Sequence, residues 1–266
     1  MVPIRRVIGL AVVFTFAFGQ KVTFEAVTPK LIEERLRAAP KKQAEREPLI
    51  EEFFRQAGCG ENLTTQVVKG QKSPNVICRL VGKGPGEIVV GAHFDLRNSG
   101  GVVDNWSGAA MLVALFQSLR AAERKHTFVF IAFTAEEQGL LGSKAYVKQN
   151  DLSNVRAMVN VDTLALGDTK VEVNNSDKTL LRYLDEMARA TNLPLAGVNF
   201  EAVGRSDDLP FREKKIATIA IHSLTQERLG VLHTSKDTFE AVDFEAYQRT
   251  YRLLAPYLAY LDLKLD

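Results

Sequence analysis

Continuous apolar runs alternate along this chain with helical patterns, and this alternation constrains the fold more than any other feature. The runs "EIVVGAHF" (87–94), "HTFVFIAFTA" (126–135) and "IATIAIHSL" (216–224) are rich in Val, Ile and Phe. Because they are nearly continuous rather than alternating, they are typical of strands buried on both faces. Strands separated by helical patterns favour a three-layer α/β sandwich, with a mixed, mostly parallel central sheet and helices on both faces.

The other segments continue this pattern. No repeat and no Pro/Gly-rich linker divides the chain, so we expect a single domain. The remaining expected elements are helices at 31–38 and 43–56, a hairpin at 63–68 and 75–80, helices at 108–122 and 140–149, a strand at 155–166, a helix at 179–190 and a closing helix from Phe244. In such sheets ligands bind beyond the carboxyl ends of the strands.

The first residues have the three-part layout of a secretory signal. Two arginines precede a short apolar run, Val7–Phe18, which ends in small residues. Cleavage is expected between Gly19 and Gln20, and the run is short for a membrane span, which needs about 20 apolar residues. We therefore expect a signal peptide at 1–19 and a secreted or periplasmic domain at 20–266; a buried helix or a membrane anchor is the alternative.

Composition and charge narrow the partners. The 266 residues are 46% apolar and 25% charged, as in an ordinary globular protein. Without Arg5 and Arg6, which fall in the expected signal, the 34 basic residues come down to the number of acidic ones, 32. A near-neutral chain argues against binding nucleic acid or anionic membranes through bulk charge.

Two cysteines are present, Cys59 and Cys78. In an oxidising compartment they could pair across the expected hairpin. A reduced buried Cys78 with an unrelated surface Cys59 is the alternative, and the sequence leaves both open.

Polar side chains interrupt the pattern first in "GAHFDLRNSGGVVDNWSGAA" (91–110). His93 and Asp95 are two apart in a strand and point to one face, so Asp95 could buttress the His93 ring; a hydrogen-bonded histidine at a strand end is the alternative. Asp104 opens a helical pattern and could be its N-cap. A cap does not explain the neighbouring glycines, which allow close backbone approach.

Three later segments carry similar side chains. Glu136 and Glu137 follow an apolar strand, where an acidic first helical turn is the alternative. Asp162 lies within an apolar strand and needs a partner, because a buried unpaired charge costs several kcal/mol. His233 lies in a loop after the last apolar strand and could be an ordinary surface histidine.

Together these segments supply two histidines and four acidic side chains at the rim of one sheet: His93, Asp104, Glu136, Glu137, Asp162 and His233. That inventory fits two Zn²⁺ ions, each with one histidine and carboxylates, that share an aspartate. One glutamate is then free to act as a base.

The segments "GAHFD", "DNWSGAA", "FTAEEQGLLGSKAYV", "NVDTLA", "RSDDLPF" and "LHTSKDT" resemble the co-catalytic di-zinc aminopeptidases, a family of secreted bacterial leucine-type aminopeptidases, over about residues 75 to 240. The resemblance implies that His93 and Asp162 bind one zinc and that Glu137 and His233 bind the other. It implies that Asp104 bridges both.

The resemblance also assigns roles beyond the ligands. Glu136 matches the family's general base, and Asp95 stands behind His93 in a supporting catalytic role. The Asp104–Asn105 peptide is expected to be cis.

The sequence departs from the family pattern at two positions. Leu232 stands where some relatives place a tyrosine whose hydroxyl helps to hold the oxyanion, and Asp208 stands where a histidine or aromatic residue is common. These departures leave the shape and charge of the substrate pocket open. Arg205, Asp207 and Phe211 are the expected pocket residues.

The resemblance implies a zinc-dependent aminopeptidase, a metalloexopeptidase with two Zn²⁺ per chain, that acts as a monomer on peptides with a free N-terminus. A glutaminyl-peptide cyclotransferase with one zinc is the alternative, because that related fold also has an aspartate, a Glu-Glu pair and a late His-Thr. A non-catalytic binding domain is a third reading, disfavoured because such domains lose ligands or the base and this chain retains every one.

Overall fold

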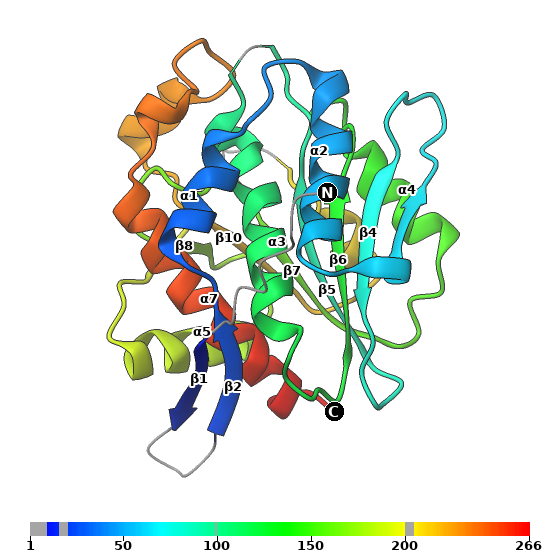
Figure 1. Ribbon diagram of the computed structural model, residues 1–266, viewed down its shortest axis with the longest axis vertical. Helices are drawn as coiled ribbons and strands as arrows, with labels where there is room; N and C mark the ends of the chain where they lie inside the picture. The colour runs from blue at the N-terminus through cyan, green and yellow to red at the C-terminus, as the bar shows by residue number, and fades with distance from the viewer. Residues whose placement is uncertain (1–9, 16–20, 99, 200–204) are drawn as a thin grey trace, which may run out of the picture.

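A central sheet with helices on both faces forms the body of the molecule (Figure 1). The structure is a computed structural model, and it describes residues 10–15, 21–98, 100–199 and 205–266. In spatial order the eight strands are β3 (Leu63–Gln66), β4 (Asn75–Leu80), β6 (Thr127–Phe133), β5 (Glu87–His93), β7 (Val155–Val161), β10 (Thr218–His222), β8 (Lys170–Glu172) and β9 (Ala196–Val198).

The sheet is mixed and mostly parallel, as predicted. Strand β5 runs parallel to both neighbours, β6 and β7, and β10 is parallel to β7. The β8–β9 pair is also parallel, whereas the β3–β4, β4–β6 and β10–β8 pairs are antiparallel. The parallel centre brings the carboxyl ends of β5, β6, β7 and β10 to one edge of the sheet.

Helices cover the sheet on both sides. One face packs against α1 (Pro29–Arg37), α2 (Gln43–Gln56), α3 (Ser107–Leu119), α5 (Lys178–Thr191) and α7 (Phe244–Lys264), the first three and the last lying in front of the sheet in Figure 1. The other face packs against α4 (Leu141–Gln149) and α6 (Leu209–Glu213). The three-layer prediction is confirmed.

Burial on both faces explains the continuous apolar strands. In β5, Ile88 and Val90 belong to the core beneath α3 and α7, whereas Val89 belongs to the core beneath α4, and all three side chains are 0% exposed. Burying one such side chain stabilises the fold by about 1.5–3 kcal/mol. A polar residue at every second position would therefore be costly on either face.

Most expected elements are present with small shifts at their ends, but the strand expected at 155–166 ends at Val161, so that Asp162 follows the strand instead of lying within it. Helix α2 and strand β4 have the predicted bounds, and β3 ends at Gln66 rather than at 68. A π-helical turn, η2 (Val102–Trp106), precedes α3 and contains the expected cis Asp104–Asn105 peptide. The three-residue strands β8 and β9 were not predicted, since so short a segment has no readable periodicity.

The N-terminal residues form a separate two-stranded sheet. Strand β1 (Leu10–Thr15), within the expected signal, pairs antiparallel with β2 (Lys21–Ala26), whose Val22 and Phe24 are buried in the main core. The expected cleavage point between residues 19 and 20 lies outside the described residues. Within the described residues, every helix is too short or too polar to cross a membrane.

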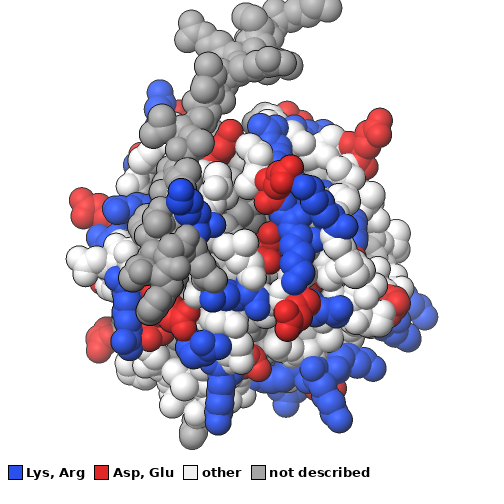
Figure 2. All heavy atoms as spheres, turned by 90° about the horizontal axis from the view of Figure 1, so that it is seen from below, with Lys and Arg blue, Asp and Glu red and all other residues white. Residues whose placement is uncertain are grey.

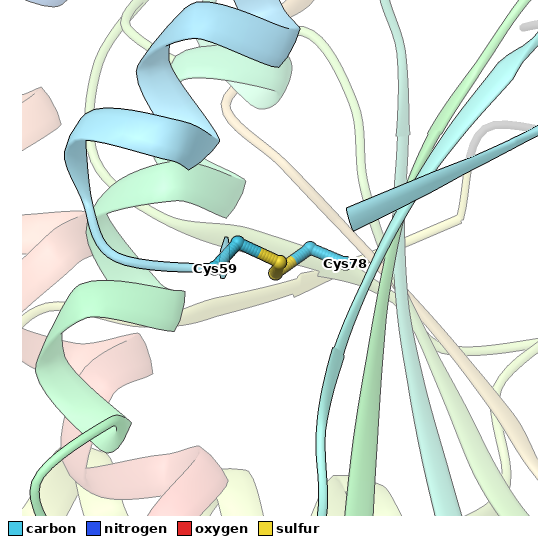
Figure 3. The surroundings of a disulfide bond; sticks show 2 residues. All are labelled: Cys59 and Cys78. Atoms are coloured by element: carbon cyan, nitrogen blue, oxygen red, sulfur yellow. A yellow bond between two sulfur atoms is a disulfide. The ribbon is translucent and has the colours of Figure 1, made fainter. Parts of the chain in front are cut away.

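The two cysteines form a disulfide (Figure 3). Cys59 lies just beyond the end of α2, Cys78 lies in β4, and their Cα atoms are 6.1 Å apart. Closing a loop with a sequence separation of 19 residues stabilises the fold by about 3 kcal/mol through the chain entropy of the unfolded state. The bond fastens the C-terminal end of α2 to the sheet.

Candidate metal centre

A pocket of about 550 Å³ opens at the carboxyl ends of the central strands. His93 is the last residue of β5, Glu136 and Glu137 follow β6 by three and four residues, and Asp162 directly follows β7. These four residues line the pocket together with Asp104 and His233. The topology therefore brings together all six side chains that the sequence singled out.

The six side chains include two groups of potential ligands that share one residue. His93 Nε2 lies 3.2 Å from Asp104 Oδ1 and 3.5 Å from Asp162 Oδ1. His233 Nε2 lies 3.0 Å from Asp104 Oδ2 and 2.9 Å from Glu137 Oε1. Each oxygen of Asp104 thus faces a different histidine, which is the arrangement of a bridging carboxylate.

The spacing of these donors suits zinc. Tetrahedral Zn²⁺ with bonds of about 2.0–2.1 Å holds neighbouring ligand atoms about 3.3 Å apart. Within each group the ligand atoms all lie within 4.8 Å of one another, and the histidine–carboxylate distances are 2.9–3.5 Å. Imidazole and carboxylate are ordinary zinc ligands. The residues present therefore fit a cation in each group.

Asp104 is held by residues of a distant loop. Asp237 accepts hydrogen bonds from the backbone N–H of Val103 (2.6 Å) and of Asp104 (3.1 Å). The Asn105 side chain accepts from the Thr163 N–H (3.1 Å) and so links the π-helical turn to the end of β7. Asp237 lies four residues after His233, and its role could not be predicted from the sequence.

Asp95 lies behind His93, where it was expected, and has a further contact. Its Oδ1 lies 3.4 Å from His93 Nδ1, although this ring nitrogen has no hydrogen-bond partner among the described residues. The carboxylate also accepts hydrogen bonds from the backbone N–H groups of Glu136 (3.0 Å) and Glu137 (3.2 Å). Asp95 therefore fixes the turn that presents both glutamates, which starts at Ala135 with a left-handed φ of 54°.

Asp162 is satisfied by hydroxyl groups. Ser206 Oγ donates to Asp162 Oδ2 (2.6 Å) and Thr163 Oγ1 donates to Asp162 Oδ1 (3.0 Å). The Asn160 amide in turn donates to Ser206 Oγ (2.7 Å), which orients the hydroxyl toward the carboxylate. Such support fixes the direction of a ligand oxygen.

The histidines and the shared aspartate favour their charged forms. Burial alone lowers the pKa of His93, but the carboxylates of Asp162 and Glu136 outweigh it and raise that pKa well above its usual value. The pKa of Asp104 is raised by burial but lowered further by hydrogen bonds from His233 and His93, so it falls below its ordinary range. The hydrogen bond to Asp104 raises the pKa of His233.

Glu136 is the most perturbed acid of the pocket. Burial raises its pKa to about 10, and the carboxylates of Asp207 and Asp162 add to the rise against the opposing effect of His93. A nearby positive charge favours a carboxylate, and bound cations are the largest local charges in such sites. A cation in the neighbouring groups would therefore lower the pKa of Glu136 toward the range in which it works as a base.

The substrate side of the pocket differs from the expectation. Arg205 lines it, but Asp207 and Phe211 are 0% exposed and do not. The short helix α6 explains the difference, because its turn directs Asp208 and Arg212 to the pocket while Phe211 packs into the core under α4. Burial raises the pKa of Asp207 to about 7 and that of Asp208 to about 6.

Two further residues complete the wall. Leu232 lines the pocket beside His233, so the position of the family's tyrosine hydroxyl is apolar. His222 ends β10 and also lines the pocket, although it was not among the predicted site residues. Its Nδ1 accepts the Leu224 N–H (3.1 Å), and burial lowers its pKa to about 4, so the ring is neutral. The position of His222 at the end of the apolar run "IATIAIH" (216–222) is the sequence feature that could have predicted its place in the pocket.

A mostly parallel α/β sandwich, with two histidine–carboxylate groups around a shared aspartate at its carboxyl edge, is the architecture of a metallohydrolase. Within that class the chain belongs to peptidase family M28, whose profile matches residues 75–258.

Named relatives agree with this membership. The chain is 30% identical over 200 residues to the aminopeptidase YwaD of Bacillus subtilis, which corresponds to 71% of this chain and 43% of that protein. Three curated relatives, this one and two fungal proteins named probable zinc metalloprotease, are covered over only 37–43% of their length.

Solved structures share the fold. The LapA aminopeptidase of Legionella pneumophila superposes with a TM-score of 0.78 at 20% identity, over 90% of this chain and 73% of that one. A glutaminyl cyclase from an Acidobacteriales bacterium superposes with a TM-score of 0.74 at 21% identity, over 89% of this chain and 94% of that one.

Proposed function

We propose that this protein is a zinc-dependent aminopeptidase that holds two Zn²⁺ ions. The observation that carries the proposal is the pair of ligand groups that share Asp104, with Glu136 beside them in one pocket of a family M28 chain. His93 and Asp162 would hold one ion, and Glu137 and His233 the other. When bound, zinc supplies Lewis acidity toward the scissile carbonyl and toward water.

Glu136 handles the proton in this reaction. It lines the pocket but belongs to neither ligand group, so its carboxylate is free for proton transfer. It accepts a proton as water forms the new C–O bond, and it delivers that proton to the amine as the C–N bond breaks. Asp95 holds the backbone of Glu136 in place during both steps.

The charges around the pocket support a peptide substrate with a free N-terminus. The nearly buried Asp208, which belongs to neither ligand group, lines the pocket, where a carboxylate attracts a protonated amine. Arg97 and Lys144 are exposed at the same pocket and can meet carboxyl groups farther along the peptide.

The partners proposed from the sequence stay the same: peptides, no nucleic acid, and a monomeric enzyme. On the face seen in Figure 2, Lys and Arg side chains are interspersed with Asp and Glu. Binding to a polyanion by bulk charge favours a basic patch or stripe of one sign.

A glutaminyl-peptide cyclotransferase with one zinc is the second candidate. The observation in its favour is the shared fold: the glutaminyl cyclase structure superposes on 89% of this chain with a TM-score of 0.74. The M28 match favours hydrolysis. The two complete ligand groups also favour it, because the cyclase would need only one zinc ion and therefore only one group.

A substrate panel with metal analysis tests the proposal. We expect the purified protein to release the chromophore from aminoacyl substrates, to lose this activity in a chelator and to regain it with added zinc. We expect about two zinc ions per chain by elemental analysis. Cyclisation of an N-terminal glutamine peptide by protein holding one zinc, without release from the panel, would establish the cyclase instead.

We also propose export with removal of residues 1–19. The described Cys59–Cys78 disulfide supports an oxidising compartment, because such bonds are rare in the cytosol. Mass spectrometry of the protein recovered from an expressing bacterium should find Gln20 as the first residue and both cysteines oxidised. An intact N-terminus with reduced cysteines would contradict export.

A further inference from the structure

Arg46 is a wholly buried arginine that the metal chemistry does not explain. It lies in the first turn of α2, before the residues that match the family profile, and it is 0% exposed. Arginine is almost never fully buried unless paired. Its partners therefore indicate what the side chain does.

Three of the partners of Arg46 are carbonyl oxygens of residues that lie between His93 and Asp104 in the sequence. Arg46 Nη1 donates to Phe94 O (3.1 Å), and Nη2 donates to Gly100 O (2.9 Å) and to Gly101 O (2.8 Å). Nε donates to Pro40 O (3.1 Å) just before α2. Phe94 directly follows His93, and Gly100 and Gly101 come shortly before Asp104. One planar guanidinium therefore donates hydrogen bonds to both ends of the loop that joins these two expected ligands.

The loop lies close against this guanidinium. Gly101 has a left-handed φ of 68°, and a Cβ atom on it would lie 2.9 Å from Arg46 Nη2. Only a residue without a side chain allows this approach. The Trp106 ring, which ends the π-helical turn that carries Asp104, lies with its centroid 5.5 Å from Arg46 Cζ, a cation–π distance.

Arg46 keeps its positive charge in this buried position. Burial lowers its pKa to about 10, while Asp237, Asp95 and Asp104 raise it, so the side chain is a cation at neutral pH. Burying a cation carries a large desolvation cost unless hydrogen bonds offset it. An apolar residue would fill the same space without that cost, but it could not donate hydrogen bonds to the three loop carbonyls of Phe94, Gly100 and Gly101.

We propose that Arg46 is a positioning residue of the metal centre, which fixes the 94–101 loop so that His93 and Asp104 keep the separation that a shared cation requires. The inference rests on the zinc sites of the proposed function but not on the reaction that they serve. Helix α2 is itself fixed, since the Cys59–Cys78 disulfide ties its far end to β4. Residues outside the family profile thus support the site.

The test compares Arg46→Lys with Arg55→Lys in the full chain. Lysine keeps the charge but not the planar fork. Arg55 lies on the same helix, is exposed and pairs with Glu51. We expect Arg46→Lys to weaken zinc binding by about 10- to 100-fold in competition with a chelator, as loss of supporting contacts does elsewhere. We expect Arg55→Lys to bind zinc like the parent chain.

Two further measurements separate positioning from general stability. The visible spectrum of the cobalt-substituted protein should change in Arg46→Lys, and kcat should fall while KM stays constant. Arg46→Met, which fills the space without the donors, should bind zinc at least as weakly. A lower Tm in Arg46→Lys with zinc affinity and cobalt spectrum unchanged would overturn the inference. Altered metal binding in a chain that hydrolyses no aminoacyl substrate would overturn only the proposed function.

Discussion

Glu136→Gln is expected to lower kcat by about 10²- to 10⁴-fold, the usual contribution of a positioned acid–base group. The amide has the shape of the carboxylate but cannot accept a proton from water or deliver one to the leaving amine. Glu136 belongs to neither ligand group, so the variant should hold the same amount of zinc. Steady-state kinetics on an aminoacyl chromogenic substrate, with zinc measured in the same sample, checks both statements.

Glu172→Gln is the matched control. Glu172 also lines the pocket, at the end of the short strand β8, and belongs to neither ligand group. We expect this variant to keep kcat within a few-fold of the parent chain. Turnover by Glu136→Gln at the parent rate with full zinc would show that the proton passes through another group. Loss of zinc from Glu136→Gln would show that Glu136 is a ligand.

The sequence predicts the layers of this fold well because burial leaves a simple pattern. A strand covered on both faces, such as β5, must be apolar throughout, and its end is marked where His93 meets the pocket. The roles of the six polar residues came from the family resemblance, whereas the proximity of four of them could be predicted because parallel strands bring their ends to one edge. That argument needs no knowledge of side-chain geometry.

The supporting contacts could not be read in the same way. Asp237 accepts a backbone N–H and Arg46 donates to backbone carbonyls between residues 94 and 104. Every residue type has these backbone groups, so the sequence does not indicate which residue will be the partner. Asp95 lies behind His93 as expected, but its hydrogen bonds from the N–H groups after β6 were not predicted. The sequence places residues on strands and loops, whereas the direction of a loop side chain depends on tertiary packing.

The pocket residues were the least predictable part for the same reason. Asp207 is adjacent to Asp208 and Phe211 is adjacent to Arg212, and the short helix α6 decides which pair lines the pocket. With five residues, that helix is too short for a hydrophobic period to reveal its buried side. A shift of one residue in the chain at this helix would exchange the residues that face the core with those that face the pocket.

Asp104→Asn is expected to reduce zinc binding and activity together. The two oxygens of Asp104 face different histidines, at 3.2 Å from His93 and 3.0 Å from His233. Asparagine offers one neutral oxygen and an NH₂ group that repels cations, so at least one ion should be lost. Since the metals contribute several kcal/mol of charge stabilisation and 1.36 kcal/mol is a factor of ten, we expect kcat/KM to fall by about 10³-fold.

Elemental analysis and chelator competition measure the first effect, and hydrolysis of the best aminoacyl substrate measures the second. Asp151→Asn is the control, because Asp151 is an exposed aspartate that accepts hydrogen bonds from Ser153 away from the pocket. It should change neither zinc content nor rate. If Asp104→Asn held two zinc ions with the affinity of the parent chain, the carboxylate would not be their bridge. The ions would then be held by His93 with Asp162 and by His233 with Glu137 alone. Unequal loss, with one ion kept at full affinity, would instead show which group depends more on the shared oxygen.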